Sequence, residues 1–537
     1  MGRWHETPPA WHELRRHLLP LAVPIITESM LSRLMTVVDL LMVGHLGAES
    51  LAAAGLGNNF FDLLQHPIFG CATALDTLLS QAFGAKQLDA YAAWTETGLT
   101  LLMLLSVPYI VLLSLAGPIL TAAGVEHSVA QRAAEFCLQL TWGVPAHLGF
   151  HVLTKYCRAQ SLVMPSVVIA IIANIANAAS NWLLIHGLGL GFSGAPIATS
   201  LSRWVQLALI LAYMALRRRD LAGTLPSPRA ALSCRELPER ARIFFRLGVP
   251  GALMMALEAW FFEMSTFEAS FLGTRPFDAH IVLLNVCAFT FLSFPFAIGI
   301  AVSIRVGQAL GAGEPSAARR AAMLAMVLVL GVMSSLALLK IVVRDYLGWL
   351  FSDDADVVAS VSRLVFIAAL FQVSDGMQAA VAGVMRGMGK QAVVAWTNVL
   401  GFWVLGGPIG SALCFGARLG VAGLWWGMAA GLTVAALVGV GLVLRTDWAV
   451  EARVARERAG AVQDRGNDIT AGTEVPQAPL TRDATASLTA IASERQHAGS
   501  EQAEATSPWQ ELNPAAMEAR ATHNASDGES PSTQPKP

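Results

Sequence analysis

Charged residues are scarce in this chain. Asp, Glu, Lys and Arg make up only 14% of its 537 residues and 54% are hydrophobic, whereas soluble globular domains carry about 25% charged residues. The mean hydropathy of +0.53 points the same way. This composition excludes an ordinary soluble enzyme and indicates an integral membrane protein, so the lipid bilayer is the expected partner and nucleic acid is not.

Paired cysteines and cofactor motifs are missing too. Six cysteines are scattered, mostly within apolar segments, with no spacing typical of a disulfide framework or a zinc site. The stretch GLGFSG (189–194) has the letters of a dinucleotide motif but joins two apolar segments, and GVMRGMGKQ (383–391) lacks the spacing of a phosphate loop. We therefore expect no metal, no cofactor and no enzymatic activity, and any transport must draw on an ion gradient.

What the chain has in abundance is apolar segments of membrane-spanning length. A helix needs about 20 apolar residues to cross a bilayer, and twelve windows qualify, at 18–43, 50–80, 92–120, 128–152, 163–187, 192–216, 244–272, 277–303, 321–343, 356–385, 392–415 and 420–444. Lys and Arg gather in the loops on the side of the N-terminus. The positive-inside rule then predicts that both termini are cytosolic, in the plasma membrane or in a vacuolar or other organellar membrane.

The chain also repeats itself. SQAFGAKQLDAYAA from residue 80 returns as GQALGAGEPSAARRA from residue 307, so Gln81 corresponds to Gln308 at an offset of 308 − 81 = 227. Six spans per copy, an even number, give both copies the same orientation, which is a transporter architecture. We expect an all-α membrane protein whose twelve helices form two six-helix lobes related by parallel duplication. The predicted segments are a cytosolic N-terminal segment 1–17, an N-lobe 18–216, a basic cytosolic linker 217–243, a C-lobe 244–445 and a disordered cytosolic tail 446–537.

Acidic residues lie deep within the predicted spans. PGALMMALEAWFFEMSTFEASFLG (250–273) carries Glu258, Glu263 and Glu268, and Asp375 lies in a later span. A carboxylate in hydrocarbon costs several kcal/mol. At about 100° per residue, Glu258 and Glu263 lie about 140° apart, so protein or water must surround this helix on most sides.

Such a carboxyl group has a physical use. Burial raises the pKa of a carboxyl towards neutrality, so the group can hold a proton and release it when its surroundings become wetter or a cation arrives. A proton and a cationic substrate then compete for one negative charge. That competition is the basis of antiport.

Several blocks together resemble the multidrug and toxic compound extrusion (MATE) family over nearly all of residues 18–445. They are VGHLGAESLAAAGL (43–56), GCATALDTLLSQAFGAKQ (70–87), LTKYCRAQSLVMP (153–165), PGALMMALEAWFFE (250–263), IAVSIRVGQALGAGEPSAAR (300–319) and GVMRGMGKQ (383–391). LEAWFFE and NWLLIHGLGLGFSGAPIATSLS (181–202) resemble the eukaryotic branch most. In that branch, the resemblance implies, Glu258, Glu263 and Asp375 serve proton coupling and substrate binding.

The N-lobe resembles the prokaryotic members only in part. Asp39 stands where prokaryotic-type members have an acidic residue on the first helix, and Asn181 stands where many of them have another on the fifth. Asn174 and Asn177 are candidate supports for this site. We favour the C-lobe as the principal site, with Asp39 as a candidate contributor.

The sequence thus predicts a monomeric secondary antiporter that exports small organic compounds, cationic or amphipathic, in exchange for protons. The alternatives are a sodium-coupled exporter and a lipid-linked precursor flippase of the same superfamily, whose cavity should be rich in Arg and Lys. Apolar and aromatic walls suit varied cations. The candidate cavity-lining residues, besides the three asparagines, are Phe60, Phe61, Met254, Met255, Trp260 and Phe261.

Overall fold

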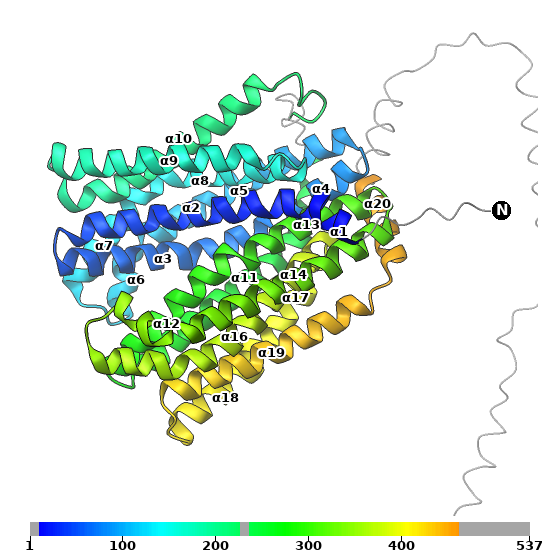
Figure 1. The fold of residues 1–537 in the computed structure, drawn as a ribbon. Coiled ribbons are helices and arrows are strands. Elements are labelled where there is room, and N and C mark those ends of the chain that lie inside the picture. Colours follow the sequence, from blue (N-terminus) through cyan, green and yellow to red (C-terminus); the bar gives the residue numbers. More distant parts are fainter. Residues whose placement is uncertain (1–9, 226–235, 461–537) are drawn as a thin grey trace, which may run out of the picture. The chain divides into compact units, whose positions relative to one another are not determined.

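The computed structural model describes residues 10–225 and 236–460, and its regular secondary structure in these ranges is helical throughout (Figure 1). The first half of the described chain, here the N-lobe, contains fourteen elements. They are α1 (Ala10–Glu13), η1 (Leu14–Leu18), α2 (Leu19–Gly44), α3 (Ala48–Ala72), α4 (Ala74–Gly84), α5 (Leu88–Ser114), α6 (Ala116–Ala122), α7 (His127–Leu140), η2 (Thr141–Gly143), α8 (Val144–Ala159), α9 (Met164–Trp182), η3 (Leu183–Gly187), η4 (Gly191–Ser193) and α10 (Gly194–Leu216).

The second half, here the C-lobe, repeats this plan. Its elements are α11 (Leu237–Ser270), α12 (Thr274–Ser293), α13 (Pro295–Gly311), α14 (Pro315–Val342), α15 (Arg344–Leu347), η5 (Gly348–Leu350), α16 (Ala355–Met388), α17 (Gln391–Asn398), η6 (Val399–Gly406), α18 (Gly407–Ser411), η7 (Ala412–Gly416), α19 (Val421–Leu444) and α20 (Trp448–Gly460). Helices α3, α5 and α9 begin at residues 48, 88 and 164, and their counterparts α12, α14 and α17 begin at 274, 315 and 391, an offset of 226 or 227. The duplication read from the sequence is therefore present in the fold.

Ten of the described helical segments are long and apolar enough to cross a membrane. The two other predicted spans fall on α3–α4 and on α7–η2–α8, which are helical but interrupted or more polar. Helix α3 carries Asn58, Asn59 and Asp62, and α7 carries Gln131 and Arg132. Polar side chains lower the hydropathy of these two segments and do not prevent them from being helical, because every backbone hydrogen bond is made within the helix.

The two lobes meet where α4 crosses α13. A Cβ atom on Gly311 would lie 2.9 Å from the carbonyl carbon of Gln81, and one on Gly84 would lie 2.8 Å from that of Gln308. Since Gly84 corresponds to Gly311 and Gln81 to Gln308 at the same offset of 227, the crossing lies on the pseudo-twofold axis that relates the lobes. Only residues without a side chain allow two backbones to approach this closely.

Pseudosymmetric hydrogen bonds support the crossing. Gln81 Nε2 donates to the carbonyl oxygen of Gly387 at 2.9 Å, and Gln308 Nε2 donates to that of Ala159, also at 2.9 Å. The N-terminal part of α2 packs against α13 near the same place, through Leu21 among others. The lobes are therefore joined at the end of the helices that carries α4, α13 and α20 (Figure 1).

One prediction for the tail is wrong. Residues 448–460 form helix α20, although the composition of the chain from residue 446 onwards predicts a disordered tail. Its buried residues Trp448, Ala452, Ala455 and Ala459 are spaced by four, three and four, which gives the helix one apolar face. Arg458 Nη1 donates to Gln81 Oε1 at 2.9 Å and to the Met388 carbonyl at 3.3 Å, so α20 contacts both lobes. The rest of the predicted tail, 461–537, lies outside the described residues.

Candidate functional site

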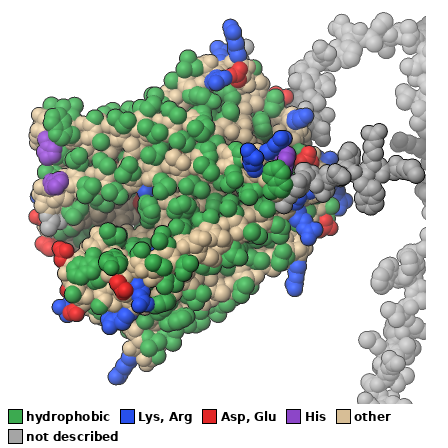
Figure 2. Space-filling model, in the orientation of Figure 1, with side chains coloured by type: hydrophobic (Ala, Val, Ile, Leu, Met, Phe, Trp, Pro, Cys, Tyr) green, Lys and Arg blue, Asp and Glu red, His purple; other side chains and the backbone are tan. Residues whose placement is uncertain are grey.

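The surface is hollowed between the two lobes, at the end that carries α6 and α7 (Figure 2). An acidic side chain from each lobe lies close enough to the other for their charges to interact. Glu263 of α11 and Asp62 of α3 are both solvent-exposed, and their charges repel each other. Asp62 also interacts with two cations, Arg33 and Arg203. The groups that interact with Glu263 include no cation.

Glu258 lies in a separate, more buried environment. Its side chain is hydrogen-bonded to Asn398 of α17 and attracted by the Arg386 guanidinium. Asn398 is completely buried, donates to the Met254 carbonyl at 3.0 Å and accepts from Gln378 Nε2 at 2.9 Å. Asn398, held by two other hydrogen bonds, therefore positions Glu258, while Gln378 Oε1 has no hydrogen-bond partner among the described residues.

Asp375 of α16 lies close enough to Glu258 for their charges to repel each other. Its side chain is buried, and the nearest attracting cation is Lys340 of α14, also buried. Lys340 Nζ lies 3.6 Å from Cys287 Sγ. The structure therefore brings together Glu258 and Asp375, and it turns Glu263 away from them towards the cleft.

Arg386 links this pair to the crossing between the lobes. Its guanidinium interacts with Glu258 and with Asp76 of α4, and lies 5.6 Å from the ring centroid of Phe296. Its carbonyl oxygen accepts a hydrogen bond from Thr77 Oγ1 of the N-lobe at 2.6 Å. A change of charge at Glu258 thus acts on a residue whose backbone joins the two lobes.

The N-lobe has a smaller polar site around Asp39. Asn181 Nδ2 donates to Asp39 Oδ1 at 2.7 Å, and Thr199 Oγ1 donates to Oδ2 at 2.8 Å. Asn181 Nδ2 also donates to Asn177 Oδ1 at 3.2 Å. Asn174 is not part of this network, because its side chain donates to the Ala170 carbonyl of its own helix.

The candidate wall residues divide into packed and accessible groups. Phe60, Phe61, Met254 and Phe261 are buried in the lobe cores and Met255 is partly buried, whereas the side chain of Trp260 is 40% exposed. Phe61 lies beneath the Arg203 guanidinium, 4.4 Å from ring centroid to Cζ. In this conformation most of these side chains serve packing.

Sequence reasoning missed several residues of the site, namely Asn398, Gln378, Lys340, Thr199 and Arg203. Each is a polar or charged residue inside a predicted span, which is the signal that was available. Their partners lie far away in the sequence or on other helices, so the pairing itself had no sequence signature.

Comparison with known proteins agrees with this architecture. The family model described as MatE matches residues 24–183 and 250–411. Protein DETOXIFICATION 14 of Arabidopsis thaliana is 34% identical over 446 residues, covering 82% of this chain and 90% of its own length. Multidrug and toxin extrusion protein 2 of Mus musculus is 31% identical over 448 residues, covering 82% and 76%.

A solved structure shows the same fold. The crystal structure of the eukaryotic MATE transporter AtDTX14 superposes with a TM-score of 0.78 and 31% identity, over 84% of this chain and 99% of that one. The resemblance inferred from the sequence blocks, including its eukaryotic character, is confirmed. The chain is a multi-pass membrane protein and belongs to the MatE family of multidrug and toxin extrusion transporters.

Proposed function

We propose that this protein exports small organic compounds, cationic or amphipathic, in exchange for protons, with Glu258 and Asp375 as the principal coupling pair. The observation that carries the proposal is the proximity of these two carboxyl groups inside the C-lobe, where they repel each other and a hydrogen-bond network fixes one of them. The names of the relatives support the export of toxic compounds.

The chemistry follows from like charge in a buried place. Two neighbouring carboxylates cannot both be ionised without repulsion, so a proton on one of them relieves the pair. A cation bound beside this pair offers the same relief and makes the proton dispensable. Loading of the substrate and release of the proton are then two ways of neutralising the same excess negative charge.

Arg386 supplies a route from this exchange to the conformation. When Glu258 is charged, it attracts the Arg386 guanidinium, and the Arg386 backbone accepts the Thr77 hydrogen bond that joins the lobes. Protonation of Glu258 weakens that attraction and leaves Arg386 to Asp76. We infer that this shift biases the α4–α13 crossing between joined and separated states.

Charge supports an orientation in which the crossing faces the cytosol. Arg158, Arg217, Arg319 and Lys390 lie at the same helix ends as the crossing, and cytosolic loops carry an excess of such residues. The cleft would then open away from the cytosol, and both termini would be cytosolic. We place the protein in the plasma membrane or in a vacuolar or other organellar membrane, as a monomer.

The test is uptake of a labelled organic cation into proteoliposomes under an imposed pH gradient. We expect Glu258→Gln, Glu263→Gln and Asp375→Asn each to lower gradient-driven transport at least about tenfold, a barrier change of about 1.4 kcal/mol. Asp39→Asn is the matched comparison in the N-lobe and should retain gradient-driven transport. Size-exclusion profiles of every variant check folding.

Three results would contradict the proposal. Full activity of both the Glu258 and Asp375 variants would remove the C-lobe pair from the mechanism. Uptake that requires sodium and ignores the pH gradient would replace the coupling ion. Transport of a lipid-linked pyrophosphate instead of organic cations would favour the flippase alternative.

A further inference from the structure

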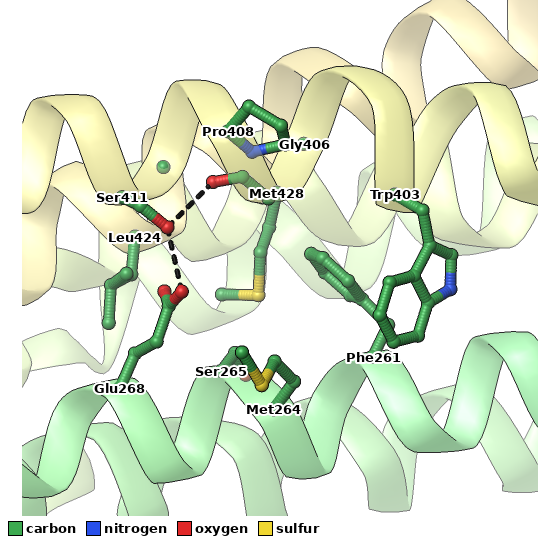
Figure 3. Close-up of a pocket in the computed structure, with 12 residues that line it drawn as sticks. Phe261, Met264, Ser265, Glu268, Trp403, Gly406, Pro408, Ser411, Leu424 and Met428 are labelled. Atoms are coloured by element: carbon green, nitrogen blue, oxygen red, sulfur yellow. Dashed lines mark hydrogen bonds between the residues drawn. The ribbon is translucent and has the colours of Figure 1, made fainter.

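A cavity lies in the C-lobe away from the Glu258–Asp375 pair, between α11, the η6–α18 segment and α19 (Figure 3). Its volume is about 240 Å³. One face of α11 forms a wall through Phe261, Met264, Ser265 and Glu268, which are spaced by three, one and three residues. Positions with this spacing project from the same side of a helix.

The repeat explains why there is empty space here. Pro24 and Pro250 align α2 with α11 at an offset of 250 − 24 = 226, so Asp39 corresponds to Ser265. Gly194 packs against Ile185 in the same way that Gly423 packs against Cys414. This match aligns α10 with α19 at an offset of 423 − 194 = 229.

At that offset the N-lobe polar site has a counterpart residue for each member. The offset is 227 at the starts of α9 and α17 and 229 at the Ile185–Cys414 pair. Extended back from that pair, the 229 register matches Asn177 with Gly406, Asn181 with Gly410 and Thr199 with Met428, and all three counterparts line the cavity, as Ser265 does. In the N-lobe, two asparagine side chains occupy this space, and Asn181 donates both to Asp39 and to Asn177 Oδ1. In the C-lobe, two glycines leave it open.

A carboxylate stands at one end of the cavity. Ser411 Oγ lies 2.7 Å from Glu268 Oε1 and 3.0 Å from the Gly407 carbonyl oxygen (Figure 3). None of the ion pairs among the described residues includes Glu268. A cationic ligand would therefore be the ion-pair partner that the described residues do not provide for this carboxyl group.

Aromatic rings and thioethers line the cavity beside its glycines, Pro408 and Leu424. The rings of Phe261 and Trp403 meet edge to face at 6.1 Å, and the thioethers of Met264 and Met428 lie between them and Glu268 (Figure 3). Trp403 Nε1 donates to the Leu257 carbonyl at 3.0 Å, which fixes the orientation of its indole ring. A carboxylate combined with π faces and sulfur atoms suits an organic cation.

The cavity lies next to an exposed apolar surface. Along α11 and at the residue that follows it, Trp260, Met264, Phe267 and Phe271 are exposed at spacings of four, three and four. Val404 of η6 is 55% exposed nearby. These exposed apolar side chains offer an apolar path by which an amphipathic ligand can reach the cavity.

We propose that this C-lobe cavity is a second ligand site, which holds the ammonium group of a membrane-partitioned amphipathic cation at Glu268. The proposal rests on the proposed function, because it supplies a site where exported cations collect from the bilayer. It differs from the coupling pair in position, since Glu268 lies ten residues beyond Glu258 along α11, about 15 Å at 1.5 Å per residue.

The probe is tritiated benzyltrimethylammonium, and binding is measured by equilibrium dialysis of the full chain in neutral maltoside micelles. The Glu258→Gln/Asp375→Asn background silences the coupling pair. We expect this background to retain one binding site, and we expect added Glu268→Gln to weaken its affinity at least tenfold. Neopentylbenzene, the uncharged isostere of the probe, should not compete.

A second variant tests the cavity without removing the charge. Gly407 lines the cavity, and a Cβ atom built on it would lie 3.4 Å from the Phe261 ring, which is van der Waals contact. The Gly407→Met side chain therefore adds volume at the cavity lining without a severe clash at its Cβ. It should also weaken binding at least tenfold. Gly416→Met is its control, because no neighbouring atom lies within 4 Å of a Cβ built there.

Unchanged affinity in both the Glu268 and Gly407 variants overturns the proposal. Equal competition by neopentylbenzene also overturns it, because the cavity would then be an uncharged apolar crevice. Displacement by dihexanoylphosphatidylcholine at lower concentrations than by unlabelled probe would assign the cavity to a lipid headgroup instead. Binding does not require transport, so a wild-type protein that binds the probe but shows no gradient-driven uptake would refute the proposed function alone.

Discussion

The crossing of α4 and α13 provides the sharpest test of how the lobes are held together. The perturbation is Gly311→Ala, alone and combined with Gly84→Ala. At Gly311 the new Cβ would lie 2.9 Å from the Gln81 carbonyl carbon and 3.0 Å from the Ala85 nitrogen. Both neighbours are backbone atoms, so the clash cannot be relieved by a side-chain rotation and the helices must move apart.

The magnitude follows from overpacking. Forcing an extra carbon into a filled contact costs about 1–3 kcal/mol, and that cost applies only to the state in which the lobes are joined at the crossing. Coupling energies of this size shift a two-state equilibrium by about 5- to 150-fold. We therefore expect the separated state to gain population by a factor in this range.

Pseudosymmetry gives a further quantitative expectation. Gly84 meets Gln308 in the way that Gly311 meets Gln81, across the same axis. One separation of the helices relieves both clashes at once. The double variant should therefore shift the equilibrium by less than the sum of the two single shifts, the kind of non-additivity expected for contacting residues.

The assay is a distance measurement by double electron–electron resonance between spin labels at Asp89 and Ser316, exposed positions at the starts of α5 and α14. Gly311→Ala should show a larger fraction of long label-to-label distances than the wild type. Gly331→Ala is the control, because no atom would lie within 4 Å of its Cβ. An unchanged distance distribution in Gly311→Ala, or an equal change in Gly331→Ala, would refute the reasoning.

Two other predictions follow from contacts near the crossing. Lys155→Met leaves the buried Asp76 carboxylate without the ammonium group 2.6 Å away, so it should lower the free energy of unfolding by about 3–5 kcal/mol. Thermal unfolding in detergent measures this loss. The control is Arg217→Met, which breaks an exposed pair with Asp220 and should cost less than about 1 kcal/mol. Deletion of 461–537 should leave transport unchanged. Deletion from 447 also removes α20 with its Arg458–Gln81 hydrogen bond, so it should increase the long-distance fraction in the spin-label assay. Equal behaviour of the two truncations would show that α20 does not help to join the lobes.

The sequence by itself determined the class of this protein and much of its plan. Apolar length and the 227-residue repeat depend on local composition and register, so they predicted the membrane helices, the duplication and the buried acids Glu258 and Asp375. The polar residues of α3 and α7 did not hide these two predicted spans, because the apolar residues around them still form windows long enough for a membrane helix. A local signal that was overlooked is the alanine face of α20.

Only the tertiary structure decided which of these residues act together. Glu258 meets Asn398 and Asp375 on other helices, and Glu263, five residues away, turns to Asp62 in the other lobe. The glycines at the crossing and at the C-lobe cavity have no individual signature either, because their effect is the space they leave for a distant neighbour. Helical periodicity fixes the face on which a side chain lies, but the neighbour of that face is set by packing between residues far apart in the chain.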